Sequence, residues 1–135
     1  MKIAVDAPIE PGMSAAGVNL GTAVADILRD NSELLAGQPL AGWSTIHGSF
    51  VSLSVRHGVV RQVLVHGDYS GRVKGLVGLG SSVAQLSVLL GAWSEGAYGN
   101  EIEVPALPGV FFETEPPGPR PPDQALIVKI GVYSE

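Results

Sequence analysis

A chain of 135 residues fits one domain, residues 1–135, and is long enough to bury roughly two thirds of its unfolded surface. The absence of cysteine excludes disulfides, thiol chemistry and zinc–thiolate sites. No apolar run reaches the roughly 20 residues that a membrane helix needs. Residues 1–6 also lack the features of a secretory signal, so we expect a cytoplasmic protein with no membrane partner.

The net charge of −5 is unevenly distributed along the chain. Acidic and basic side chains balance in residues 1–75, whereas residues 76–135 contain seven acidic side chains and only Arg120 and Lys129 as bases. Nucleic-acid binding needs clustered Lys and Arg, so this distribution argues against a nucleic-acid partner. The acidic second half instead predicts a partner of basic charge.

The first part of the chain predicts a strand, a loop and a helix. Residues 1–6 alternate as a strand would, and residues 7–16 are expected to form a loop. A helix is predicted from about Thr22 to Asp30, with Asn31 as a left-handed stop. One further helical turn is expected before Gly37.

A hairpin is the clearest local signal, and the strands expected around it are residues 43–47, 50–56 and 59–66. A two-residue turn at His57 and Gly58 would place Leu53 opposite Gln62 on the buried face. A three-residue loop separates apolar from polar side chains better and leaves Arg61 as the exception, so we favour that register. The buried face would then contain Val51, Leu53, Val55, Val59, Val63 and Val65.

The second part of the chain predicts a helix and then three more strands. The helix should run from Ser81 or Ser82 to about Leu90, with Gly91 just past its end. The strands expected after it are residues 101–104, 110–115 and 125–133. Residues 116–124 are rich in proline and are predicted to form a stiff loop between the last two strands.

The two predicted helices begin with similar sequence. The sequence pattern of residues 17–28 recurs fifty-nine positions later in residues 76–86, with Gly21-Thr22 matching Gly80-Ser81. We expect both hydroxyl oxygens to accept hydrogen bonds from the first free N–H groups of their helices. The residues expected to face the core are Val24, Ile27, Leu28, Val83, Leu86 and Leu90. The sequence thus predicts an α+β fold of two degenerate repeats, about residues 13–72 and 73–135, each a short helix packed on an antiparallel β-meander.

Motifs for catalysis or cofactor binding are weak. His47, His66 and Asp68 could meet and hold a metal ion, but a one-residue register shift would separate the histidines, so ordinary strand histidines are the favoured interpretation. Gly78-x-Gly80 lacks the third glycine and the βαβ unit of a dinucleotide site. No nucleophile elbow or phosphate loop occurs. We therefore predict no catalytic residue, no metal and no cofactor, and a protein that is not an enzyme.

Carboxylates in the second half form the most informative pattern. Side chains two residues apart share a face of a strand, so Glu101 and Glu103 lie on one face of their strand, and Glu113 and Glu115 on one face of theirs. Pairing of the two strands would therefore create one acidic surface. Such a surface is either a solvated sheet face or a docking surface for a basic partner. Nearby aromatic residues would suit an interface. The predicted partner-binding residues are Glu101, Glu103, Glu113, Glu115, Trp93, Tyr98 and Asp123.

The pattern Gly-Val-x-Leu-Gly-Thr-x-Val-x-x-Ile-Leu at residues 17–28, followed by a meander and repeated, resembles that of small bacterial inhibitor and immunity proteins. It is similar to the tandem helix-plus-sheet repeats of the beta-lactamase inhibitory protein class and the related outer-membrane assembly lipoproteins. It also resembles immunity proteins encoded beside polymorphic toxins. Without a cysteine or a lipoprotein signal, the cytoplasmic immunity proteins are the favoured resemblance.

This resemblance implies a stoichiometric binder that covers the active site of a cognate toxin and needs no catalytic residue. We expect the protein to be a monomer or a weak homodimer. The alternative functions are an assembly module that binds through a sheet edge and, less favoured, a small enzyme or ligand carrier.

Overall fold

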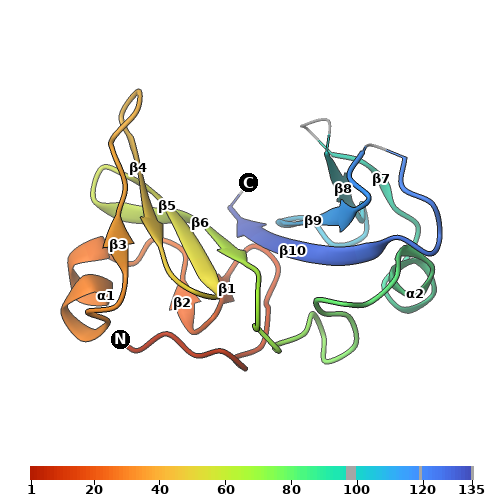
Figure 1. The fold of residues 1–135 in the computed structure, drawn as a ribbon, viewed down its shortest axis with the longest axis horizontal. Coiled ribbons are helices and arrows are strands. Elements are labelled where there is room, and N and C mark those ends of the chain that lie inside the picture. Colours follow the sequence, from red (N-terminus) through yellow and green to blue (C-terminus); the bar gives the residue numbers. More distant parts are fainter. Residues whose placement is uncertain (97–99, 119, 135) are drawn as a thin grey trace.

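A computed structural model of the chain describes all residues except 97–99, 119 and 135. It is an α+β fold with a large antiparallel sheet and two short helices, α1 (Val24–Asp30) and α2 (Val83–Leu89) (Figure 1). The strands, in chain order, are β1 (Ser14–Ala15), β2 (Val18–Asn19), β3 (Leu35–Ala36), β4 (Trp43–His47), β5 (Val51–Arg56), β6 (Val59–Val65), β7 (Ser94–Glu95), β8 (Glu101–Glu103), β9 (Val110–Glu115) and β10 (Leu126–Tyr133).

Eight strands form one sheet in the order β3-β4-β5-β6-β10-β9-β8-β7, and β1 pairs with β2 in a separate hairpin. Strands β6 and β10 therefore meet at the centre. Each half of the sheet is made of four consecutive strands, with α1 preceding β3–β6 and α2 preceding β7–β10. Figure 1 shows the two helices at opposite ends of the molecule, each beside its own half of the sheet.

The chain approaches both helices through matching backbone hydrogen bonds. The Gly21 N–H donates to the Val60 carbonyl, and the Gly80 N–H donates to the Ile127 carbonyl, both at 2.8 Å. In each case the strand residue donates back to the carbonyl of the residue after the glycine. Both glycines have positive φ, 87° and 89°, a conformation that a side chain disfavours.

The core lies on the face of the sheet that carries the helices. Ile27, Val83 and Leu86 of the helices are fully buried against it, and the other predicted helix core residues are partly buried, as predicted. Burying one such large aliphatic side chain contributes about 1.5–3 kcal/mol. One buried row crosses five strands in direct register: Ile46, Leu53, Val63, Val132 and Val110.

The β5–β6 hairpin combines a two-residue turn with a β-bulge. His57 and Gly58 both have positive φ, and Arg56 pairs with Val59, which is the geometry of a tight hairpin turn. The register then shifts, and Arg61 is the extra residue on β6. The predicted three-residue loop is therefore wrong.

Because the bulge restores the alternation, the predicted buried face is confirmed beyond it. Leu53 pairs with Val63 and Val51 pairs with Val65, and all four are fully buried. Next to the turn, Val60 is buried in place of the predicted Val59.

The predicted roles of Thr22 and Ser81 as helix caps are wrong, because both lie two residues before their helices begin. The Thr22 hydroxyl donates to the Asn19 carbonyl at 2.7 Å, and the Ser81 hydroxyl accepts from the Gly78 N–H at 3.1 Å. These hydroxyls stabilise the turns that lead into the helices.

Only α2 has a side-chain cap. The Ser82 hydroxyl accepts from the Gln85 N–H at 3.1 Å, and the Gln85 side chain accepts from the Ser82 N–H at 2.8 Å. This reciprocal pair is a capping box. The corresponding residue of α1 is Ala23, which has extended dihedrals and no side-chain cap.

Four further predictions in the first part of the chain are wrong. Residues 1–6 form no strand, and the predicted loop of residues 7–16 contains β1. Asn31 has a φ of −139° and is not left-handed. The segment after it ends in the edge strand β3 and adds no helical turn.

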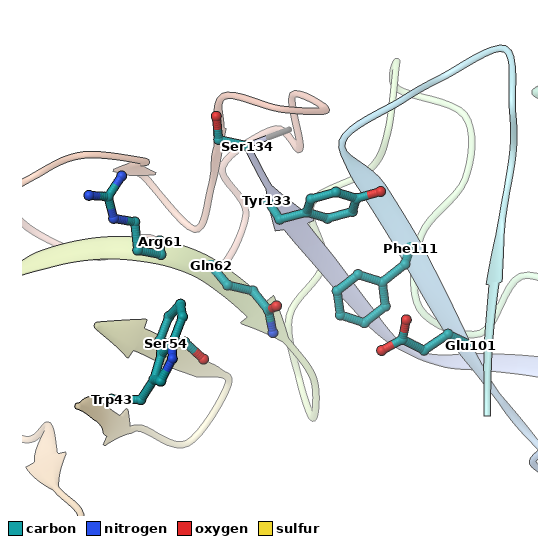
Figure 2. Close-up of a pocket in the computed structure, with 8 residues that line it drawn as sticks. All are labelled: Trp43, Ser54, Arg61, Gln62, Glu101, Phe111, Tyr133 and Ser134. Carbon is teal, nitrogen blue, oxygen red and sulfur yellow. The ribbon is translucent and has the colours of Figure 1, made fainter. Parts of the chain in front are cut away.

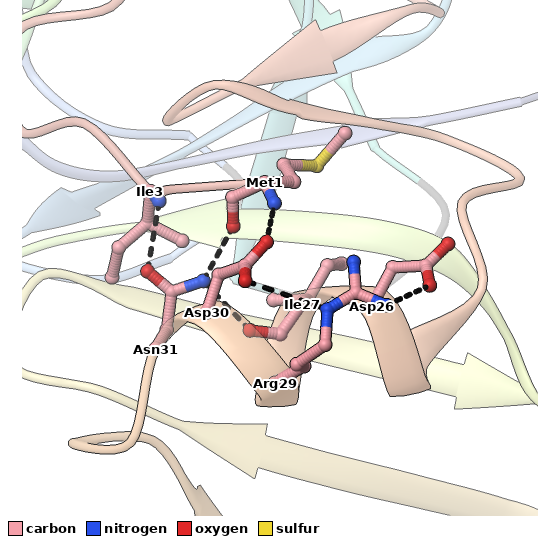
Figure 3. Close-up of polar contacts among 7 residues, drawn as sticks. All are labelled: Met1, Ile3, Asp26, Ile27, Arg29, Asp30 and Asn31. Atoms are coloured by element: carbon pink, nitrogen blue, oxygen red, sulfur yellow. Dashed lines mark hydrogen bonds and ion pairs between the residues drawn. The ribbon is translucent and has the colours of Figure 1, made fainter.

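Asn31 ties the start of the chain to the end of α1 (Figure 3). Its buried amide donates to the carbonyls of Met1 and Ile27 at 2.6 and 2.7 Å, and its side-chain oxygen accepts from the Ile3 N–H at 3.0 Å. The Met1 amino group also pairs with the Asp30 carboxylate. These bonds satisfy backbone groups at a helix end that lacks a left-handed stop.

The presence of a side-chain cap on α2 and its absence from α1 give a matched stability test. Ser82→Ala should lower the free energy of unfolding by about 1 kcal/mol, because the Gln85 N–H loses its acceptor. Ala23→Ser should raise it by up to about 1 kcal/mol, because the extended Ala23 backbone already suits a cap. Urea denaturation of both variants measures the two changes. Equal and negligible changes would contradict this account of the helix ends.

Candidate functional site

The face of the sheet opposite the core forms the candidate site, and we call it the open face. Both helices pack on the other face, so the open-face side chains remain mostly half-buried or exposed. Its residues are polar, charged or aromatic, with few aliphatic members. They include Trp43, Thr45, His47, Ser52, Ser54, Arg56, Gln62, Leu64, His66, Glu101, Glu103, Phe111, Glu113, Glu115, Lys129 and Tyr133.

The open face is curled into a trough. One cavity of about 570 Å³ is lined by six neighbouring strands, from Trp43 on β4 to Glu101 on β8. In a flat sheet these two strands would lie about 24 Å apart, five spacings of about 4.8 Å. Figure 1 shows β3–β5 and β7–β9 rising on either side of the central strands. Figure 2 shows the lining residues, which are Trp43, Ser54, Arg61, Gln62, Glu101, Phe111, Tyr133 and Ser134.

Aromatic side chains form the floor and one wall of this trough. Phe111 is only 4% exposed because its ring lies on Gly131, where an added Cβ would be 2.1 Å from the ring. The Tyr133 ring lies 6.1 Å from the Phe111 ring, centroid to centroid. On the opposite wall, the Arg56 guanidinium lies 5.3 Å from the centre of the Trp43 ring, within cation–π range. The trough is therefore apolar at its base and charged at its walls.

The predicted acidic strands pair, which is confirmed by Glu101 lying directly opposite Glu113. Glu103 and Glu115 follow on the same face by the period of two. The Tyr133 hydroxyl donates to Glu103 at 2.8 Å, and the Asn100 amide donates to Glu113 at 3.1 Å. We call these four carboxylates the acidic wall.

The acidic wall is electrostatically unfavourable for the free protein. Partial burial, followed by the charges of Glu113 and Glu103, raises the pKa of Glu101. Like charges directly opposite each other across a strand pair cost up to about 1 kcal/mol. A cation placed in the trough would relieve this repulsion.

Two of the remaining predicted partner-binding residues lie elsewhere. Trp93 is half-buried and packs against the core. Asp123 is exposed beside α2, where its carbonyl accepts from the Ala84 N–H at 3.0 Å. Tyr98 lies outside the described residues. The structure therefore brings together the four glutamates and does not bring Trp93 or Asp123 to them.

A second cavity of about 570 Å³ lies on the same face, towards the other end of the central strands. The Ser52 hydroxyl and Nε2 of His66 lie 3.1 Å apart there. Burial, followed by the charges of Lys129 and His47, lowers the pKa of His66. Sequence reasoning noted the histidines but missed Ser52 and Lys129, although the alternation of β5 placed Ser52 opposite the core side chains.

The Ser52–His66 contact supplies two parts of a nucleophilic relay. Such a relay also needs a group that orients the imidazole, usually a carboxylate. Among the described residues, no carboxylate is hydrogen-bonded to His66, so we assign no reaction to this pair. Within the same residues, no cluster of three metal-ligating side chains occurs.

No protein-family model matches the chain, and neither a curated protein nor a solved structure matches it. Across the described residues, no helix is long and apolar enough to cross a membrane. The open face is therefore the feature of the molecule that bears on function.

The raised pKa of Glu101 predicts how the acidic wall titrates. Glu113→Gln should move the pKa of Glu101 down towards its ordinary value of 4.5, because one of the neighbouring charges is removed. Since the folded-state pKa is raised, ionised Glu101 destabilises the fold above that pKa, and the cost is relieved as the pH falls through it. Carboxyl NMR titration measures the shift. Glu115→Gln is the control, and an equal shift in both variants would contradict the assigned cause.

Proposed function

We propose that the protein is a stoichiometric binding protein that docks a protein partner in the trough of the open face. The observation that carries this proposal is a single cavity lined by six adjacent strands, with aromatic side chains at its base. Protein interfaces use partly exposed aromatic residues as anchors, surrounded by polar side chains. Trp43, at 38% exposed, and the half-buried Tyr133 are suited to that role.

The negative charge of the acidic wall favours a partner with a basic surface. A lysine or arginine of the partner near Glu101 and Glu113 would compensate the burial and repulsion that raise the pKa of Glu101. Opposite charges also speed association and disfavour wrong partners. Binding of this kind needs neither a catalytic residue nor a cofactor.

Within this proposal the partner is a cognate bacterial toxin, and the protein acts in the cytoplasm by covering the toxin's active site. The resemblance to immunity proteins implies this partner. The matching hydrogen bonds at Gly21 and Gly80, and the helix that precedes each half of the sheet, support two repeats of about residues 13–72 and 73–135. A monomer or weak homodimer would leave the open face accessible to the toxin.

Assembly through a sheet edge is the weaker candidate. The two edge strands, β3 and β7, have two residues each. Addition of a strand derives its affinity from a row of main-chain hydrogen bonds. Edges this short offer few such bonds, whereas the trough spans most of the sheet.

Charge reversal tests the proposed surface. Glu101→Lys with Glu113→Lys should slow association with the partner by about tenfold or more and weaken its salt dependence, because electrostatic steering is lost. The partner is first co-purified with the tagged protein, and its association is then measured by surface plasmon resonance from about 50 to about 500 mM salt. Growth rescue on co-expression would separate a toxin from an assembly partner.

The matched control is Glu10→Lys with Glu33→Lys, which makes the same change of charge at exposed residues away from the open face. It should slow association much less. Equal effects of the two double variants, or wild-type kinetics that do not vary with salt, would argue against docking at the acidic wall.

A further inference from the structure

We propose that the second cavity of the open face binds a carboxylate side chain of the partner, so that the partner is recognised by two opposite charges. This inference rests on the proposed function and specifies the chemistry of the partner. We call the cavity the donor pocket. Its lining residues include no acid, and they are Thr45, His47, Ser52, Ser54, Gln62, Leu64, His66, Gly67, Val128 and Lys129.

Strand pairing holds the polar groups of the donor pocket close to one another. His47 lies directly opposite Ser52, and Ser54 lies directly opposite both Thr45 and Gln62 on its two neighbouring strands. Side chains directly opposite each other have Cβ atoms about 4.5–5.5 Å apart. The two oxygens of one carboxylate can therefore accept hydrogen bonds from neighbouring strands at once.

The charge in and around the donor pocket also favours an anion. Lys129 is its permanent cation, and no ion pair between described residues includes it. Burial, followed by the repulsion from Lys129 and His47, lowers the pKa of His66. One acid, Glu113, lies directly opposite Lys129 on β9. A bound carboxylate would raise the pKa of His66 again.

The donor pocket adjoins the cavity beside the acidic wall, because Ser54 and Gln62 line both. One partner segment can therefore fill the two cavities together, with a base near Glu101 and an acid near Lys129. The nearby acidic wall disfavours a phosphate dianion more than a carboxylate, since repulsion grows with charge. This favours a protein side chain over a free phosphate as the ligand.

A small carboxylate probe tests the donor pocket without the partner. We would titrate the ¹⁵N-labelled protein with acetylated aspartic acid amide and follow the backbone and His66 ring signals by NMR. Saturable shifts should centre on Ser52, His66 and Lys129, and the pKa of His66 should rise at saturation. Lys129→Ala should weaken the probe's affinity about tenfold, because a charged hydrogen-bond donor is removed. Lys2→Ala, at an exposed site in the N-terminal segment, should leave it unchanged.

Three results would overturn the assignment. They are shifts equal to those from sodium chloride at the same ionic strength, affinity that survives Lys129→Ala, and saturation by inorganic phosphate at a tenfold lower concentration than the aspartate probe. The last would assign the pocket to a small free anion. The proposed function fails separately, if the aspartate probe binds while Glu101→Lys with Glu113→Lys leaves partner association unchanged.

Discussion

The fold depends on the pairing of β6 with β10 at the centre of the sheet. Four residue pairs join these strands, from Ile130 with Val65 to Tyr133 with Gln62. The strands lie far apart in sequence, so their pairing closes a long loop, and burial must offset the entropy lost. Val63, Val65, Ile130 and Val132 supply that burial, because all four are fully buried.

The same pairing builds the open face, because alternate residues of paired strands point away from the core. Gln62, Leu64 and Tyr133 lie over the centre of the trough, and Gly131 leaves space for the Phe111 ring. Curling of the sheet about this centre brings Trp43 and Glu101 to one cavity. The core and the candidate site are thus the two faces of the same paired strands. A one-residue change of register would turn the buried side chains to the open face and the open-face side chains to the core.

Local patterns predicted most strands because their signal lies within a few residues. Alternation along β5, β8 and β9 indicated which side chains are buried, and it also indicated that the four glutamates share a face. The bulge at Arg61 was not predictable in the same way. The turn residues His57 and Gly58 suit more than one loop length, and the burial of Val63 and Val65 decides the register.

The trough could not be predicted, because it results from contacts between strands distant in sequence. Period two placed Ser52 and Ser54 away from the core, but nothing in the sequence indicated that β4 and β8 would line one cavity. Sequence proximity also misled the prediction of Trp93, which lies near the glutamates in the chain yet packs against the core. The helix caps were misplaced because Gly-Thr and Gly-Ser stabilise the turns before the helices, two residues ahead of their first turns.

Side-chain oxidation of the protein with and without its partner tests docking on the open face most directly. Hydroxyl-radical footprinting read by mass spectrometry reports the exposure of each reactive side chain. Docking in the trough predicts protection of Trp43 and Tyr133, with no change at Leu89, which is 44% exposed and lies on α2. Protection of Leu89, with Trp43 and Tyr133 unchanged, would contradict the account.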